Sequence, residues 1–347
     1  MYKLLTVAIP TYNRPETLRH TLDVLCASDS NKFEILISDD SSDDRVSEMV
    51  GQYQRRFLNI RFLRNPHNLG FNANVAQLYE LSNTPYVWFL CDDDTIFEGS
   101  ISKVIKTLEK YHPAVAIFNC SWVNSYGVES LAGVSEDRLY VNRDEFNSYD
   151  VLMRMTFLSI LVFQKHDGLI EVVKKSSGFK DNVFVQLTLG LLILSNNFRL
   201  LEGAQHILHR NVGYRYGEFY KFILLDPLKA FYELPNSFDG KKFIAWSIKN
   251  MPQNMLLYLS QKIGLFEFKG LPTNESKILI RRYYGNFGLL IMLIRALSKL
   301  VPSGLLRALF FIRLYSIHGA GKTSYMYKKL LNRAHKDERD TAFTLYR

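Results

Sequence analysis

The chain has few cysteines and no long uncharged apolar run, and these two absences exclude several classes of protein. Only three cysteines, Cys26, Cys91 and Cys120, are spread over 347 residues. Their odd number and wide spacing exclude a disulfide framework and a CxxC metal site, and they fit a reducing compartment. No run of about 18 uncharged apolar residues is present, so no membrane span is predicted. Because the first three residues lead directly into the apolar run at Leu4, we expect no signal peptide.

Two familiar phosphate-binding patterns are also missing. No GxGxxG follows the first predicted strand, which excludes a dinucleotide-binding domain of the Rossmann type. The GAGKTS segment at 319–324 lacks the first glycine of a phosphate-binding loop, because Ser316 stands in its place. No nucleic-acid-binding module accompanies the 20 tyrosines and 24 phenylalanines, so we assign these rings to core packing and expect no nucleic-acid partner.

Charge is distributed unevenly along the chain. Residues 271–347 contain 14 Lys and Arg but 4 Asp and Glu, whereas residues 1–270 contain 29 basic and 30 acidic residues. Within the basic part, residues 287–317 alternate apolar blocks with single cations and read as one or two basic amphipathic helices. This pattern predicts that residues 271–347 bind an anionic surface such as a membrane. The alternatives are that they pack on the rest of the chain or form an oligomer contact.

The first 120 residues alternate between short apolar runs and amphipathic segments, which predicts an α/β fold with a mostly parallel sheet. The expected strands are Leu4–Ile9, Phe33–Ser38, Ile60–Leu63, Tyr86–Leu90 and Ala114–Phe118. The expected helices are Arg14–Ala27, Ser42–Phe57, Phe71–Leu81 and Phe97–Tyr111. Further along, we expect a helix at Val183–Leu194 and a strand at Phe198–Leu201. We therefore divide the chain into a domain at 1–215, with halves 1–120 and 121–215, and a helical basic region at 216–347.

Polar residues follow each of the first four predicted strands, and in parallel sheets ligands bind at the carboxyl ends of strands. The run Asp92–Asp94 follows the fourth strand, and three adjacent carboxylates favour a divalent cation such as Mg²⁺ or Mn²⁺ over a solvated helix-capping turn. Asp39–Ser42 follows the second strand, although Ser41 or Ser42 could serve as a helix cap. Pro10–Arg14 follows the first strand, with Asn13 a candidate cap. After the third strand, Asn68–Gly70 is predicted to turn with a positive φ at Gly70.

A strand order of third, second, first and fourth would bring three of these loops to one crevice. Base-recognising groups would then lie on one side of the crevice and metal-holding carboxylates on the other. Those are the parts needed to hold a nucleoside diphosphate with its cation.

The stretches VAIPTYNRPETL, ILISDDSSDD, NLGFNANVA and PYVWFLCDDDTIF resemble the family 2 glycosyltransferases, and the resemblance covers residues 4–120. It implies the GT-A fold of nucleotide-diphospho-sugar transferases. It also implies that Thr11, Tyr12 and Asn13 line a nucleoside pocket, that Asp39 binds the base and that Asp92–Asp94 forms a DXD-type motif. Many relatives have Asp where this chain has Cys91. The implied nucleotide-binding residues are Pro10, Thr11, Tyr12, Asn13, Arg14, Asp39, Asp40, Asn68, Gly70, Asp92 and Asp93.

The same resemblance suggests a metal set and a general base. The metal set is Asp94 with Asp92 and, from the later part of the chain, His209, whose alternative is a structural histidine. Asp181 stands where the family has the acidic pair that supplies the base, although Asn182 replaces the second acid. A plain helix cap is the alternative for Asp181.

The function implied is transfer of a sugar from a nucleoside-diphosphate sugar to a glycan hydroxyl, with inversion and without a covalent intermediate. The layout of the chain is most similar to bacterial transferases that build O-antigen or capsule repeat units. A polyprenyl-linked acceptor and a cytoplasmic position on the inner face of the plasma membrane follow as expectations. A non-catalytic nucleotide-sugar-binding subunit is the alternative, and a nucleic-acid-binding protein is a third hypothesis that rests on the basic tail alone.

Overall fold

The computed structural model describes residues 3–210, apart from 29–31, 124–128, 144, 145, 147, 176–178 and 180–183, together with the single residues 230 and 245. The predicted helical region at 216–347 and the basic residues 271–347 thus lie almost wholly outside the described residues. The described elements belong to one compact unit made of Met1–Trp122, Glu129–Asn211 and Asp226–Gly240, apart from the end of one strand. The predicted domain boundary at residue 215 stays a prediction.

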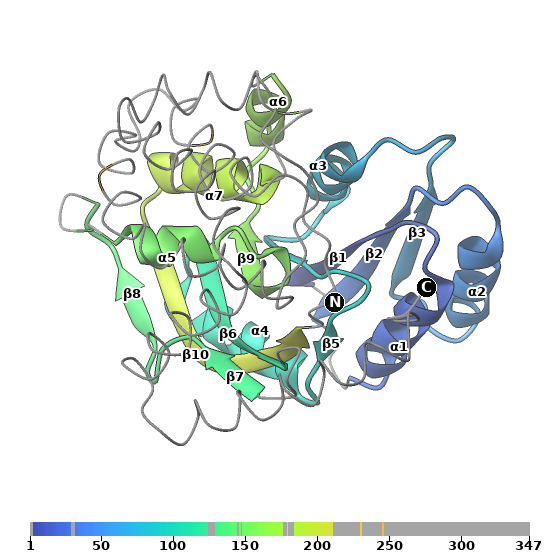
Figure 1. The fold of residues 1–347 in the computed structure, drawn as a ribbon, viewed down its shortest axis with the longest axis horizontal. Helices are drawn as coiled ribbons and strands as arrows, with labels where there is room; N and C mark the ends of the chain where they lie inside the picture. Colours follow the sequence, from blue (N-terminus) through green and yellow to red (C-terminus); the bar gives the residue numbers. More distant parts are fainter. Residues whose placement is uncertain are drawn as a thin grey trace, which may run out of the picture. The chain divides into compact units, whose positions relative to one another are not determined.

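The first half of the sheet is parallel and has the predicted strand order. Its strands run in the order β3-β2-β1-β4, and Figure 1 shows β1, β2 and β3 side by side in blue. Their bounds are β1 (Leu5–Thr11), β2 (Phe33–Asp39), β3 (Ile60–Arg64) and β4 (Tyr86–Phe89). The register pairs Thr11 with Asp39 and Asp39 with Arg64, so the ends of three strands lie level with one another.

The second half of the sheet makes the whole sheet mixed rather than mostly parallel. β9 runs antiparallel to both β4 and β6, β10 runs parallel to β6, and β5 and β8 pair antiparallel with β10. β7 pairs with β6. These strands are β5 (Thr95–Ile96), β6 (Val115–Val123), β7 (Glu129–Ala132), β8 (Arg138–Tyr140), β9 (Leu161–Gln164) and β10 (Leu200–Arg210). Strands of two to four residues carry too little periodicity to be predicted from sequence.

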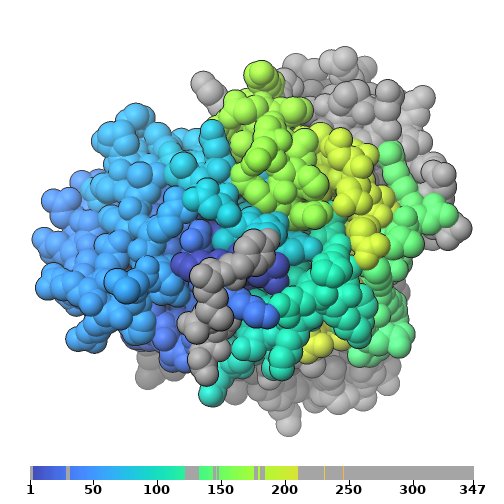
Figure 2. Space-filling model, turned by 180° about the vertical axis from the view of Figure 1, so that it is seen from behind, coloured from blue at the N-terminus to red at the C-terminus, as the bar shows by residue number. Residues whose placement is uncertain are grey.

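The helices pack on the sheet and on one another. α1 and α2 pack on each other, whereas α3 packs on β1 and β2 and also contacts α6 and α7 (Figure 1). α4 packs on β10. The helices are α1 (Pro15–Cys26), α2 (Arg45–Gln54), α3 (Phe71–Leu81), α4 (Ser100–Tyr111), α5 (Tyr149–Arg154), α6 (Leu169–Lys174) and α7 (Val185–Asn196), with the short 3-10 helix η1 at Leu158–Ile160. Figure 2 shows the structure from behind. In this view the blue residues from the early part of the chain lie mostly on the left, and the lime and yellow residues from α6 onward lie toward the right.

Burial explains why the apolar strands were recognisable. Every residue of β1, β2 and β4 is buried, as expected for central strands covered on both faces. α7 is apolar nearly all round and is buried along most of its length, which fits a helix inside the core. In the described part of the chain, no helix combines the length and the apolar character that crossing a membrane would require.

The residues predicted to cap α1 and α2 do not cap them in the structure. α1 begins after Arg14, and Asn13 has a φ of 55°, so Asn13 precedes the cap position. α2 begins after Asp44, so neither Ser41 nor Ser42 caps it. The polar side chains that local rules assign to caps instead bond to other loops. Gly70 has the predicted positive φ, at 84°.

Candidate functional site

The loop after β4 is bonded to the loop after β1. Thr11 donates its hydroxyl proton to Asp92 Oδ2 at 2.7 Å, and Thr21 Oγ1 donates to the Asp92 carbonyl at 3.1 Å. Arg14 Nη1 lies 3.1 Å from Asp92 Oδ1 and 2.9 Å from Asp93 Oδ2. The acidic turn is therefore held against the end of the first strand by a hydroxyl and by a guanidinium.

The loop after β2 joins the same group. The Asn13 backbone N–H donates to Ser41 Oγ at 2.8 Å, and the Ser42 backbone N–H donates to Asn13 Oδ1 at 2.9 Å. The Asp40 N–H donates to the Thr11 carbonyl at 3.0 Å. The three loops that follow β1, β2 and β4 thus form one connected polar edge of the sheet.

Asp39 is fully buried and already has three donors. One oxygen accepts from the Ser41 N–H at 2.8 Å and from the Ser41 hydroxyl, and the other accepts from Arg64 Nη1 at 2.8 Å. Arg64 also donates to the Asp43 carbonyl at 2.6 Å. The carboxylate predicted to bind the base therefore organises its own loop, and Arg64 is the residue that the sequence reasoning missed. Its signal was positional, because it ends β3 in register with Asp39.

Asp40 lies beneath this edge in a network of amides. Asn65 Nδ2 donates to Asp40 Oδ1 at 2.7 Å and to Ser38 Oγ at 3.1 Å, and Gln77 Nε2 donates to Asn65 Oδ1 at 2.7 Å. These residues connect the end of β2 to the middle of α3. Further out, the Gly70 N–H donates to Asn68 Oδ1 at 2.8 Å, which closes the turn before α3.

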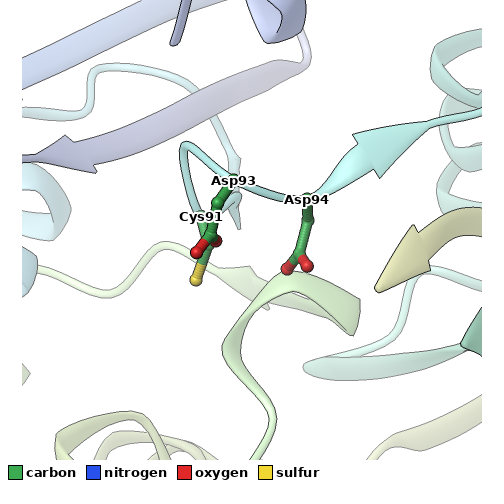
Figure 3. A group of neighbouring side chains, drawn as sticks. All are labelled: Cys91, Asp93 and Asp94. Atoms are coloured by element: carbon green, nitrogen blue, oxygen red, sulfur yellow. The ribbon is translucent and has the colours of Figure 1, made fainter. Parts of the chain in front are cut away.

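Cys91, Asp93 and Asp94 form a group with the spacing of metal ligands. One sulfur and one carboxylate oxygen from each acid lie within 4.8 Å of one another, and Figure 3 shows the three side chains on the same side of the turn. Asp94 is 2% exposed. Two carboxylates and a thiol are donors that a divalent cation accepts, so the residues present fit such an ion. Asp92, which was predicted to be in the metal set, points instead at Thr11 and Arg14.

The acidic turn carries the electrostatic cost of three adjacent carboxylates. Burial, together with the neighbouring Asp93, raises the pKa of Asp92 to about 6, although Arg14 and the Thr11 hydroxyl oppose the shift. Burial and the carboxylates of Asp94 and Asp93 hold the pKa of the Cys91 thiol well above its ordinary value. Added positive charge beside the turn would stabilise the ionised form of each group.

Residues 6–153 match the model of glycosyl transferase family 2. Residues 6–153 are a family 2 glycosyltransferase domain.

Two bacterial relatives of this glycosyltransferase domain are similar to part of the chain. The abequosyltransferase RfbV of Salmonella typhimurium is 34% identical over 104 residues, which cover 28% of this chain and 31% of that protein. The GalNAc(5)-diNAcBac-PP-undecaprenol beta-1,3-glucosyltransferase of Campylobacter jejuni is 30% identical over 103 residues, which cover 29% and 33%. The chain thus spans about a third of the length of these relatives.

A solved structure establishes the fold. The crystal structure of S. aureus TarS 1-349 in complex with UDP-GlcNAc matches with a TM-score of 0.55 at 14% identity, over 82% of this chain and 87% of that chain. The chain therefore has the GT-A fold that the sequence resemblance implied.

The remaining predicted site residues of the glycosyltransferase domain and its surroundings occupy different positions. Pro10 pairs with Ser38 inside the sheet, whereas Tyr12 is 48% exposed beside the loop edge. His209 Nδ1 lies 3.0 Å from Ser121 Oγ, and its backbone pairs with Thr95, the residue after Asp94. Asp181 lies outside the described residues. The nucleotide, metal and base roles of all these residues stay predictions.

Proposed function

We propose that the chain is an inverting glycosyltransferase that moves a sugar from a nucleoside-diphosphate sugar to a hydroxyl of a glycan acceptor. The single observation that carries the proposal is the polar edge, where three strand-end loops are bonded together next to Cys91, Asp93 and Asp94. The family match over residues 6–153 supports the reaction class. The UDP-GlcNAc complex of TarS supports a nucleotide sugar as donor.

Different residues of the polar edge have different roles in binding the donor. Asp94 and Asp93 would hold a divalent cation, Mn²⁺ or Mg²⁺, which when bound supplies positive charge to a diphosphate leaving group. Tyr12 offers an exposed ring to the nucleoside, and the loop that carries it is fixed by Asn13, which donates to Ser41 Oγ and accepts from the Ser42 N–H. Arg14 neutralises Asp92 and Asp93, and it orients the acidic turn.

The residues that we propose to act on the acceptor come from the later part of the chain. Asp181 is proposed as the general base that takes the proton of the attacking hydroxyl, with inversion by direct displacement. A polyprenyl-linked acceptor is supported by the undecaprenol in the name of the Campylobacter jejuni relative. The excess of basic residues at 271–347 suits an anionic membrane surface, so we place the enzyme on the cytoplasmic face of the membrane, in bacterial surface polysaccharide assembly.

Asp94→Asn tests the proposal directly. Purified protein is first screened against a panel of nucleotide sugars by thermal shift, with and without Mn²⁺, since a true donor raises the melting temperature in a metal-dependent way. With that donor, we expect Asp94→Asn to lose at least ~100-fold in transfer and to keep its fold. Asp167→Asn is the matched control, because the Asp167 side chain is 98% exposed and pairs with Lys165. Near-normal transfer by Asp94→Asn, or no donor shift with any sugar, would contradict the proposal.

A further inference from the structure

The acidic turn contains a sulfur atom where a magnesium site would have only oxygen. We propose that Cys91 is a ligand of the bound cation, so that the site takes Co²⁺ or Zn²⁺ in preference to Mg²⁺. The inference rests on the cation site of the proposed function, and it adds the identity of a ligand and the class of metal.

The spacing of the three donors suits direct coordination by all of them. Metal–ligand distances of about 2.0–2.3 Å place two ligands of one ion about 3–4.5 Å apart. The sulfur of Cys91 and the oxygens of Asp93 and Asp94 already lie within 4.8 Å of one another. Asp92 is not needed as a ligand, since its carboxylate accepts the hydrogen bond of the Thr11 hydroxyl, whereas Arg14 contacts both Asp92 and Asp93.

The backbone of Cys91 is fixed, which keeps the sulfur beside the two acids. The Cys91 N–H donates to Ser159 Oγ at 2.9 Å, and Ser159 is fully buried. The carbonyl of Ser159 accepts from Trp88 Nε1 at 2.8 Å, and the Asp94 N–H donates to the Cys91 carbonyl at 3.3 Å. The turn is therefore tied to β4 and to η1 at both the side-chain and the backbone level.

The chemistry of a mixed sulfur and oxygen set selects the metal. Mg²⁺ prefers six hard oxygen ligands in near-ideal octahedral geometry, and sulfur supplies none of them. Thiolates favour softer ions, and affinity for a given site rises from Mn²⁺ through Co²⁺. On binding, the thiol of Cys91 releases its proton to solvent and the thiolate binds the ion. A carboxylate at this position would remove the discrimination.

Cobalt titration of the full chain reads the sulfur ligand without any assay of transfer. We expect Co²⁺ to produce a sulfur-to-cobalt charge-transfer band in the near ultraviolet. Cys91→Ser should lose the band and weaken Co²⁺ binding about tenfold or more, whereas Cys91→Asp should bind Co²⁺ without the band and bind Mg²⁺ more tightly than the unaltered chain. Cys26→Ser is the control, because Cys26 lies in α1 away from the turn, and it should keep the band.

The outcomes separate this inference from the proposed function. Co²⁺ that binds without the band, a band that persists in Cys91→Ser, or no Co²⁺ binding at all would overturn the sulfur ligand. Metal-dependent transfer that depends on Asp94 and is unchanged in Cys91→Ser would leave the glycosyltransferase proposal standing while the ligand inference fails.

Discussion

Buried charges in the two halves of the sheet are arranged differently. In the later half, Glu202 is 3% exposed, and it accepts from Arg154 at 2.5 Å and from the Tyr140 hydroxyl at 2.9 Å. In the earlier half, Asp92 and Asp93 share the guanidinium of Arg14, and Asp94 follows directly. Charge that is matched one to one holds elements together, whereas carboxylates gathered on one turn favour a cation from outside.

Arg154→Met tests the structural side of this comparison and has the largest expected effect on stability. Removing the partner of a buried carboxylate leaves Glu202 charged and unpaired, so the free energy of unfolding should fall by about 3–5 kcal/mol. Chemical denaturation measures it. Arg19→Met is the control, because the pair of Arg19 with Glu16 is exposed and 3.5 Å long, so its free energy of unfolding should change by close to zero. If both variants lost the same free energy of unfolding, the buried pair of Arg154 and Glu202 would have no special structural role, and the comparison between the halves would fail.

The variant Arg64→Met tests whether Asp39 is a structural carboxylate with its own cation, as Glu202 is, or resembles the carboxylates of the acidic turn. If Asp39 is a structural carboxylate like Glu202, removing one of its three donors should lower the free energy of unfolding by about 2 kcal/mol. Donor-induced thermal shift should then weaken as well, because the loop after β2 loses an anchor. Arg45→Met, which removes an exposed pair with Asp43, serves as the control. A stable Arg64→Met protein with unchanged donor binding would show that the pair orders nothing.

Gly70→Ala has the smallest expected effect and examines strain at the polar edge. Gly70 has φ 84° and ψ 155°, a region that only glycine populates freely, and nothing lies within 4 Å of an added Cβ. The cost, about 1–2 kcal/mol, should therefore be conformational. Gly51→Ala, inside α2 and equally uncrowded, should instead stabilise by about 0.5–1 kcal/mol. If calorimetry found that both variants change the stability in the same direction, the prediction of backbone strain at Gly70 would be wrong.

Apolar runs and strand ends made much of the fold predictable. Three fully buried strands and the partly buried β3, each followed by polar residues, led to the correct strand order, and the helix Phe71–Leu81 was predicted to the residue. The antiparallel strands β5 and β9 were missed, because two and four residues show no clear period. Their pairing depends on distant partners, which the local sequence does not reveal.

The site was predictable in position and less so in detail. Asn13, Ser41 and Ser42 look like helix caps from local sequence, yet they bond between loops, because neighbouring strands bring those loops together. Arg64 gave no local signal, since only the register of β3 against β2 places it on Asp39. Whether a given Asp in a run of three faces inward or outward likewise depends on the turn geometry.

The bonds made by Ser159 set a lower limit on how short a working piece of this protein can be. The family match ends at residue 153, six positions before the side chain that holds the backbone of Cys91. A fragment cut at that boundary would keep Cys91, Asp93 and Asp94 but lose the Ser159 side chain that accepts the hydrogen bond of the Cys91 backbone. The minimal unit for donor binding therefore extends at least through β9, and truncation experiments should start from there.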